Sequence, residues 1–276
     1  MVGFLCATAF NIYWGMTPIF GPGTTSPTPE LAAAVHSLDL CQSTVLPVSI
    51  LEPLSKIPEY LEGIRNLSLV IWCGSSFTFP TIPEKIRALI PINAGYGATE
   101  AGPFITQIES QDEHEYMSFS PLMNAGFQHH SKDLYEMVIA KKGYAGGFQQ
   151  HIFCTFPELN KWHSKDLFSK HPRKEELRRY RGRSDDMIVL SNATNVNPLL
   201  IEGILTQHLK VITVLLTGTN KPGVAWLLEV IEPPENGEQK RVLIEELWPV
   251  VEKANAVVHE MGRVAFVGRE REVVRN

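Results

Sequence analysis

The chain has 276 residues, and its 25 lysines and arginines against 30 aspartates and glutamates give a formal net charge of −5. Hydrophobic residues make up 44% of the sequence and charged residues 20%, which excludes a disordered chain and a basic protein that coats nucleic acid. The composition therefore predicts a globular protein of one or two domains.

Residues 1–29 carry no charged side chain, because Glu30 is the first charged residue. Two interpretations of residues 1–20 compete: a targeting or anchoring segment, and a buried helix followed by a strand at 17–20. A targeting segment needs a basic start and an unbroken apolar run, whereas this stretch has no basic residue and is interrupted by Gly15 and Pro18. We therefore expect a buried helix and strand, no membrane association and a cytoplasmic protein.

The four cysteines are Cys6, Cys41, Cys73 and Cys154, and they lie too far apart for a Cys-x-x-Cys metal site or a dense disulfide framework. Their number is ordinary for a protein of a reducing compartment. We expect free thiols, most of them buried.

The first part of the chain alternates between helical and strand-like segments. Helices are expected at 30–37, 48–56, 58–64 and 83–89, and hydrophobic strands at 67–72 and 90–94. Strands joined through helices pair in parallel, and ligands of parallel sheets lie beyond the carboxyl ends of the strands. The loop at Gly74 and the segment 95–102 follow two such ends, so we expect the functional site there.

The later part of the chain has a different pattern. Turns separate short strands between 116 and 156, as in an antiparallel sheet, and helices and strands alternate after 186. Strand-like segments lie at 137–140, 151–155, 165–168, 177–182, 187–190, 211–217, 224–231 and 264–267, and helical ones at 198–207 and 238–258. The sequence therefore predicts an α/β fold, in which a parallel sheet with a small β piece is followed by a smaller α+β domain.

The segment Tyr96–Glu100 (YGATE) follows an expected strand and has the parts needed to hold a nucleotide. Its aromatic ring can stack on a base, its glycine lets the backbone approach a ligand, and its threonine can bond a phosphate oxygen. Its glutamate can hold a hard cation such as Mg²⁺. The competing interpretation is a strand-end turn with a threonine that caps a helix.

Two later segments supply Asp166 and Arg183. The carboxylate can accept hydrogen bonds from both hydroxyls of a ribose, and the guanidinium can donate a forked pair to ribose or phosphate oxygens. For each residue taken alone, a surface carboxylate or a salt-bridged arginine is the commoner explanation.

Three other patterns favour structural explanations. The basic stretch 170–183 is interrupted by Glu175 and Glu176 and lies in an acidic chain, so it predicts a solvated turn and no nucleic-acid partner. The pair His129–His130 has no further ligand at metal spacing. The segment 23–26 lacks the Gly-Lys-Ser/Thr ending of a phosphate loop and is expected to be a turn.

The order and separation of these segments resemble the adenylate-forming (acyl-activating, AMP-binding) superfamily, and within it the fungal NRPS-like, aminoadipate-reductase-type adenylation domains. The matching segments are YGATEAG at 96–102, WHSKDLFSKH at 162–171, YRGRSDDMIVLS at 180–191, and LWP at 247–249 followed by Asn255. They span most of the chain. The resemblance implies that residues 1–184 are the C-terminal part of a large AMP-binding domain and residues 185–276 an incomplete small C-terminal subdomain.

The resemblance also implies roles for single residues. It assigns catalysis to Thr99 and Glu100, binding of Mg²⁺ to Glu100, and the hinge between the domains to Asp185. Tyr96 would flank adenine, Thr99 would bind phosphate, Asp166 would bind ribose and Arg183 would contact the nucleotide. The residues implied to contact ATP are Gly74, Ser75, Tyr96, Gly97, Thr99, Asp166 and Arg183.

The sequence departs from the family at several points. Cys73–Ser76 stands where the family has Gly-Gly-Ala-Pro, and Lys165 replaces the glycine of Thr-Gly-Asp, where it would crowd the backbone beside the ribose. The family's lysine-containing phosphate loop and its Lys-Gly-Thr step have no counterpart. We therefore expect a chain truncated at both ends, marginal folding, and weak or absent adenylation by this chain alone.

The implied family reaction joins a carboxylic acid to ATP, which gives an acyl-adenylate and pyrophosphate, and then loads the acyl group on a phosphopantetheine thiol. ATP and Mg²⁺ would be the cofactors, and a carrier protein or a reductase the partner, in fungal secondary metabolism. The alternative is a non-catalytic remnant or interaction protein that retains a partial nucleotide site. The sequence leaves open whether the chain is an enzyme.

Overall fold

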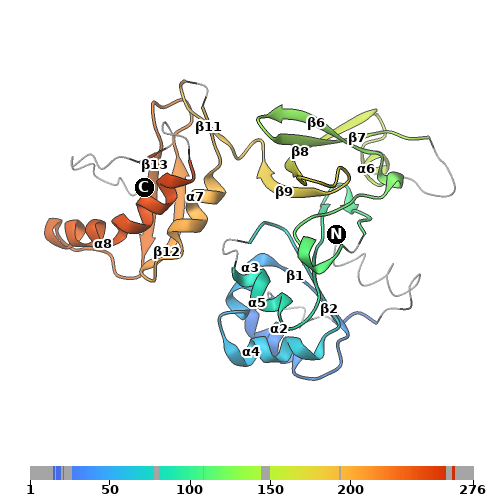
Figure 1. Cartoon of the computed structure of the whole chain (residues 1–276), viewed down its shortest axis with the longest axis horizontal. Coiled ribbons are helices and arrows are strands. Elements are labelled where there is room, and N and C mark those ends of the chain that lie inside the picture. Colours follow the sequence, from blue (N-terminus) through green and yellow to red (C-terminus); the bar gives the residue numbers. More distant parts are fainter. Residues whose placement is uncertain are drawn as a thin grey trace. The chain divides into compact units, whose positions relative to one another are not determined.

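The computed structural model describes residues 15, 17–19, 21, 27–77, 81–107, 109–143, 150–192, 194–258 and 263–264. The chain divides into two compact units, Met1–Ser184 and Asp185–Asn276, called here the first and second units (Figure 1). The helix expected in residues 1–20 lies outside the described residues, and Thr17–Ile19, which are described, form neither helix nor strand. The strand expected at 264–267 lies outside them beyond Val264.

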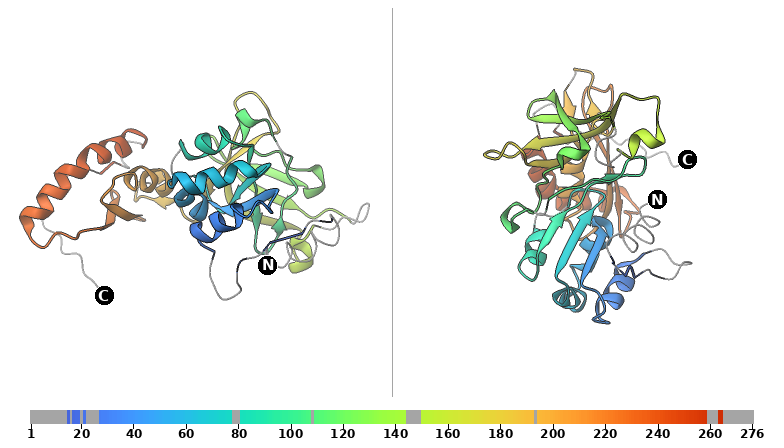
Figure 2. Two further views of the ribbon diagram at one scale, coloured as in Figure 1. Left: turned by 90° about the horizontal axis from the view of Figure 1, so that it is seen from below. Right: turned by 90° about the vertical axis from the view of Figure 1, so that its right-hand side faces the viewer.

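The first unit contains a three-stranded parallel sheet. Its strands are β1 (Ser43–Pro47), β2 (Leu69–Cys73) and β3 (Ile92–Ala94), side by side in that order (Figure 2). The parallel pairing predicted from the alternation of helices and strands is confirmed. Strand β1 was not predicted, because only part of its short run is shielded from solvent and Pro47 directly precedes a helix.

Short helices pack around this sheet (Figure 1). They are α2 (Pro29–His36), α3 (Val48–Leu54), α4 (Pro58–Gly63), the 3₁₀ helix η1 (Ile64–Asn66) and α5 (Thr81–Arg87). The side chain of Thr28 accepts a hydrogen bond from the Leu31 amide at 3.2 Å, and Pro29 occupies the first turn, so α2 begins where its sequence favours a cap. Fully buried apolar side chains between the helices and the sheet include Leu51, Leu54, Ile64, Val70, Ile86 and Ile92.

The first unit also contains a four-stranded antiparallel sheet. Its strands, in spatial order, are β6 (Ala125–Ser131), β7 (Leu134–Ala140), β8 (Lys161–Lys170) and β9 (Arg178–Arg183). Smaller elements between the two sheets in sequence are β4 (Gly97–Ala98), β5 (Gly102–Pro103), and the 3₁₀ helices η2 (Gln111–Glu113) and η3 (Pro121–Met123). The antiparallel β piece predicted from the turn-rich pattern is confirmed.

The strand predicted at 151–155 is wrong, because this segment is the short helix α6 (Ile152–Thr155). Its apolar run is too short for periodicity to separate a strand from a helix. The tertiary structure favours the helix because the side chain of Gln150, which precedes it, bonds the carbonyl oxygens of Met123 and Ala140, both at 2.9 Å. These bonds anchor the segment beside the sheet without strand pairing.

The second unit is a small α+β domain with its own core. Its elements are β10 (Ile188–Val189), β11 (Asn195–Val196), α7 (Pro198–Leu205), β12 (Val211–Thr217), β13 (Ala225–Val230) and α8 (Gly237–Ala256). Asn197 and Asn236 cap the two helices by accepting hydrogen bonds from Leu199 and Gln239 amides at 3.1 and 3.0 Å. The mixed fold predicted from the sequence is confirmed.

The prediction of free and mostly buried cysteine thiols is confirmed only in part. Cys41, Cys73 and Cys154 are free thiols, whereas Cys6 lies outside the described residues. The expected burial is wrong for all three, since Cys41 and Cys73 are half-buried and Cys154 is exposed on α6. Within the described part of the chain, no helix is long and apolar enough to cross a membrane.

Candidate functional site

The predicted segment Tyr96–Glu100 begins at the carboxyl end of the parallel sheet. The three residues of β3 are buried, and the chain leaves the strand through Gly95, whose amide donates to the carbonyl oxygen of Trp72 on β2 at 2.7 Å. Tyr96 follows directly. Because β2 and β3 are parallel neighbours, the loop that contains Gly74 and the segment that contains Tyr96 leave the same edge of the sheet, as predicted.

The segment after Tyr96 is a tight hairpin of β4 and β5, where the sequence predicted a loop. Gly97 pairs with Pro103, and the Phe104 amide donates to the carbonyl oxygen of Tyr96 at 2.9 Å. Pairing this close requires glycine, because a Cβ atom on Gly97 would lie 3.0 Å from the carbonyl oxygen of Gly102. The turn of this hairpin comprises residues 99–101.

Thr99 and Glu100 form that turn. Thr99 is exposed and Glu100 is half-buried. The carbonyl oxygen of Glu100 accepts a hydrogen bond from the Thr155 hydroxyl of α6 at 3.1 Å, so α6 steadies the turn. No group of three or more His, Cys, Asp or Glu side chains in the described ranges is arranged to hold a metal ion, and Glu100 therefore offers a single carboxylate.

Asp166 lies on β8 within an irregular stretch of the strand. Two residues of β7, Glu136 and Val138, pair with Leu167 and His163 respectively, so the residues 164–166 bulge opposite Met137. The Ser164 hydroxyl stabilises the bulge by donating to the Met137 carbonyl oxygen at 2.8 Å and accepting from the Asp166 amide at 3.0 Å. Bulges of this kind change the direction in which a side chain points. The side chain affected here is that of Asp166, a residue that is only 7% exposed.

Lys165, at the centre of the bulge, has a φ angle of 62°. This is the left-handed region, which glycine adopts without a steric penalty and other residues adopt at a cost. Lys165, which replaces the glycine of the family's Thr-Gly-Asp, therefore lies at a position whose backbone conformation favours glycine. The chain keeps the conformation with a lysine in place.

Three of the predicted residues meet at Asp166. The Tyr96 hydroxyl donates a short hydrogen bond to Asp166 Oδ2, and Arg183 Nη1 lies 3.7 Å from Asp166 Oδ1. Asp166 and Arg183 are also direct partners in the pairing of β8 with β9. Burial, followed by the negative charge of Asp166, raises the pKa of Tyr96 well above its usual value, so its hydroxyl remains protonated and donates.

Aromatic rings surround the Tyr96 ring. Their centroids lie 4.9 to 6.4 Å from that of Tyr96, and most of the rings meet it edge to face, a favourable geometry for such pairs. The surrounding residues are Phe104, Phe119, Phe168 and Tyr180. This cluster was not predicted from the sequence, because Phe168 and Tyr180 lie on two strands, β8 and β9, whereas Phe104 and Phe119 lie in separate segments outside the named helices and strands.

Gly74 and Ser75 lie in the exposed loop after β2, and Gly74 has a positive φ of 91°. The next residue, Ser76, donates from its hydroxyl to the carbonyl oxygen of Tyr180 on β9 at 3.5 Å. The loop is thereby connected to the strand whose aromatic ring lies beside Tyr96. Asp185, the predicted hinge, is exposed and is the first residue of the second unit.

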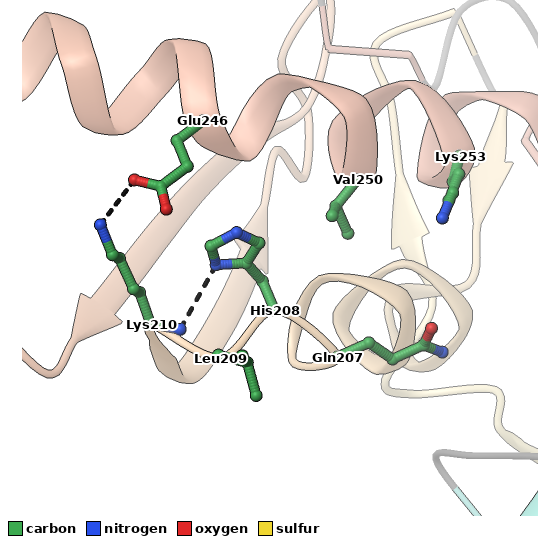
Figure 3. A pocket seen from close by; sticks show the side chains of 7 residues that line it. All are labelled: Gln207, His208, Leu209, Lys210, Glu246, Val250 and Lys253. Atoms are coloured by element: carbon green, nitrogen blue, oxygen red, sulfur yellow. Dashed lines mark hydrogen bonds and ion pairs between the residues drawn. The ribbon is translucent and has the colours of Figure 1, made fainter.

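A pocket of about 350 Å³ lies in the second unit, and no predicted residue lines it (Figure 3). Lys210 reaches across it to Glu246 on α8, with 2.6 Å between Nζ and Oε2, and the ring of His208 accepts from the Lys210 amide. The other lining residues are Gln207, Leu209, Val250 and Lys253. The pocket is an open surface feature with an internal ion pair, and its residues have no connection to the motifs in the sequence.

Comparisons with known proteins show what this chain is similar to. Residues 185–268 match the AMP-binding enzyme C-terminal domain. The chain is 30% identical to a carboxylic acid reductase of Neurospora crassa over 91% of this chain, and 25% identical to the adenylate-forming reductase Nps10 of Heterobasidion annosum over 78% of it. These matches cover 24% and 20% of the two relatives, so the chain spans about a quarter of their length or less.

The fold agrees with these relatives. The structure superposes on the unliganded O-succinylbenzoate coenzyme A synthetase MenE of Bacillus subtilis with a TM-score of 0.55 and 16% identity, over 88% of this chain and 54% of that one. Residues 185–268 therefore belong to the AMP-binding enzyme C-terminal domain family, and over most of its length the chain is similar to fungal carboxylic acid and adenylate-forming reductases and, in fold, to a coenzyme A synthetase.

Proposed function

We propose that this chain takes part in the ATP-dependent activation of a carboxylic acid, in which the carboxylate attacks the α-phosphate of ATP and gives an acyl-adenylate and pyrophosphate. The observation that carries the proposal is the contact of Tyr96 and Arg183 with the buried carboxylate of Asp166, in a chain that is similar to adenylate-forming reductases over most of its length. Three separate predicted motifs supply these three side chains.

The nucleotide is bound by residues at the edge of the parallel sheet and on β8 and β9. Asp166 accepts hydrogen bonds from the ribose hydroxyls, and Arg183, whose side chain is 40% exposed, donates to nucleotide oxygens. The Tyr96 ring lies beside adenine and the exposed Thr99 hydroxyl bonds a phosphate oxygen. Gly74, Ser75 and Gly97 allow the ligand to approach the backbone.

Glu100 holds Mg²⁺ in this proposal. A single half-buried carboxylate on a steadied turn fits this ion, which is usually bound through one or two carboxylates together with substrate phosphates and water. When bound, the ion neutralises charge that develops on the phosphates. Thr99, next to Glu100, orients the same phosphates, so these two residues act in catalysis.

We assign residues 1–184 to the C-terminal part of the large AMP-binding domain and residues 185–276 to the small domain, with Asp185 as the hinge. The division of the chain between Ser184 and Asp185 supports this assignment. The names of the relatives, a carboxylic acid reductase and adenylate-forming reductases, support later reduction of the activated acid. We propose that the acyl group is first transferred to a phosphopantetheine thiol on a carrier protein, with release of AMP. The pathway we propose is one of fungal secondary metabolism.

The test is pyrophosphate release from ATP by the purified chain with a panel of carboxylic acids. We expect slow turnover with at least one acid, in keeping with the weak adenylation expected of this chain alone, and a further loss of about 10²-fold or more in Glu100→Ala, because charge on the phosphates is no longer offset. The matched control is Glu59→Gln, on the exposed side of α4, which should leave turnover unchanged.

The outcome also separates the two candidate functions. Turnover that depends on Glu100 excludes a non-catalytic nucleotide-binding protein. Absence of turnover with every acid, beside measurable binding of AMP that Asp166→Asn weakens, would overturn the enzymatic proposal and leave the chain as a nucleotide-binding protein.

A further inference from the structure

We infer that Tyr96 is a positioning residue: its hydroxyl holds the Asp166 carboxylate in the orientation that receives the ribose hydroxyls, so that Tyr96 sets how well the site distinguishes ribose from deoxyribose. This inference rests on the proposed function, because it concerns the same nucleotide site. It gives the Tyr96 hydroxyl a role separate from that of the ring.

The backbone of Asp166 is fixed by the bulge on β8. Its amide donates to the Ser164 hydroxyl at 3.0 Å, and that hydroxyl donates to the Met137 carbonyl oxygen at 2.8 Å. These bonds determine where the Cα atom lies, but they leave rotation about the side-chain bonds undetermined. The orientation of the carboxylate therefore depends on contacts made by its own oxygens.

Two of those contacts come from segments far apart in the sequence. The Tyr96 hydroxyl bonds Oδ2, and Arg183 Nη1 approaches Oδ1 to 3.7 Å. The tyrosine contact is a hydrogen bond to a charged acceptor, which is stronger and more directional than an ion pair at that longer distance. Of these two contacts, the one with Tyr96 constrains the carboxylate plane more. A carboxylate has about four acceptor positions, so the bond is compatible with further bonds from a diol.

The donor itself is held rigidly. Phe104, Phe119 and Phe168 meet the Tyr96 ring edge to face, with centroids 4.9, 5.8 and 5.5 Å away. The backbone of Tyr96 is tied into the hairpin through the Phe104 amide, 2.9 Å from its carbonyl oxygen. The hydroxyl therefore has a fixed direction toward Asp166, across 70 residues of sequence.

The protonation state of the donor supports the same role. Burial and the charge of Asp166 raise the pKa of Tyr96 above its usual value. The hydroxyl keeps its proton through the neutral pH range. Asp166 therefore remains a charged acceptor and takes up no proton from the tyrosine.

The experiment compares binding of AMP and of 2′,3′-dideoxy-AMP by isothermal titration calorimetry. Tyr96→Phe retains the aromatic ring and removes only the hydroxyl. We expect this variant to bind AMP about tenfold more weakly than the wild type, and to bind dideoxy-AMP with unchanged affinity, because that ligand has no hydroxyls for Asp166 to receive. If Tyr96 had only a structural role, Tyr96→Phe would lower the affinities for AMP and for dideoxy-AMP by the same factor.

Two further variants complete the test. Tyr135→Phe removes a hydroxyl from β7 in the same unit and should leave both affinities unchanged. Asp166→Asn should lose most of the preference for AMP, because a neutral amide oxygen accepts from the ribose hydroxyls less strongly than a carboxylate does. Retention of the full preference in Tyr96→Phe, while Asp166→Asn loses it, would overturn the inference and leave the proposed nucleotide site standing. Failure of the wild type to bind AMP would overturn the proposed site and the inference with it.

A measurement on the wild type covers the case in which Tyr96→Phe does not fold. A buried hydroxyl proton bonded to a carboxylate exchanges slowly enough to be observed by proton NMR. Adenine beside the Tyr96 ring should move the hydroxyl signal with both nucleotides, and AMP should move it further than dideoxy-AMP because only AMP bonds Asp166. Equal movement with saturating AMP and saturating dideoxy-AMP contradicts the inference.

Discussion

Lys165 and Glu136 are joined by a hydrogen bond in which the Lys165 amide donates to Glu136 Oε1 at 3.1 Å. The bond links the centre of the β8 bulge to the neighbouring strand β7, while Lys165 has a φ angle of 62°. The carbonyl oxygen of the same residue accepts from the Ser184 amide at 2.6 Å. Lys165 is thus held in the left-handed conformation through both of its backbone groups.

Replacing Lys165 should show how much this conformation costs. Lys165→Gly removes a steric penalty of about 1–2 kcal/mol, against an entropic cost of glycine of about 0.5–1 kcal/mol. Lys165→Ala keeps the penalty and is the matched control for loss of the lysine side chain. We expect Lys165→Gly to be more stable than Lys165→Ala by about 0.5–1 kcal/mol in chemical denaturation. A Lys165→Gly variant that is less stable than Lys165→Ala would show that the bulge is not strained.

The Tyr96 hydroxyl should make stability fall at alkaline pH. The pKa of Tyr96 is raised in the folded protein, so its contribution is complete below the pKa of an unfolded tyrosine, about 10, and is lost as the pH rises through the folded value. The wild type should therefore lose up to about 1.4 kcal/mol per pH unit relative to Tyr96→Phe above about pH 10. Parallel stability curves for the two proteins would contradict the raised pKa.

His36 should have the opposite effect at acid pH. It is buried at the end of α2, and its Nε2 atom lies 3.2 Å from the Thr44 hydroxyl, whereas its Nδ1 atom has no hydrogen-bond partner among the described residues. Burial lowers the pKa of His36. Its contribution to stability is therefore present above the unfolded pKa of about 6.5 and is lost as the pH falls.

The change His36→Gln removes this titration and keeps a side chain that can bond Thr44. Between about pH 7 and pH 5 the wild type should lose stability relative to His36→Gln, by up to about 1.4 kcal/mol per pH unit. The measurement is urea denaturation at a series of pH values. His130→Gln, an exposed histidine of β6, should leave the pH dependence as it is in the wild type.

The side chain of Asn255 should hold the segment that follows α8. Its amide group donates to the Val264 carbonyl oxygen and accepts from the Val264 amide, both at 2.9 Å. Asn255→Ala removes both bonds, and we expect exchange of the Val264 amide proton to become about tenfold faster. Asn255→Asp keeps the acceptor and should retain most of the protection. Equal exchange rates in the wild type and Asn255→Ala would exclude this role.

The order of elements and the position of the candidate site were predictable from local patterns. Hydrophobic runs separated by helical segments predicted β2, β3 and their parallel pairing, and the segment Tyr96–Glu100 was placed at the carboxyl end of β3. Local patterns failed where an element is very short. The sequence predicts a strand where the structure has the helix α6, and a loop where it has the hairpin of β4 and β5. Runs of two to five residues carry too little periodicity to distinguish these structures.

The sequence by itself determined which chemical groups the chain carries and in what order, since motif spacing and hydrophobic periodicity are properties of neighbouring residues. Only the tertiary structure decided that the Tyr96 hydroxyl bonds Asp166, that Arg183 lies beside the same carboxylate, and that aromatic rings fix the direction of the bond. Tyr96 and Asp166 are 70 residues apart; Tyr96 follows strand β3 of the parallel sheet, and Asp166 lies on strand β8 of the antiparallel sheet. Their contact depends on how those sheets pack and on a bulge at Ser164, which no local pattern encodes.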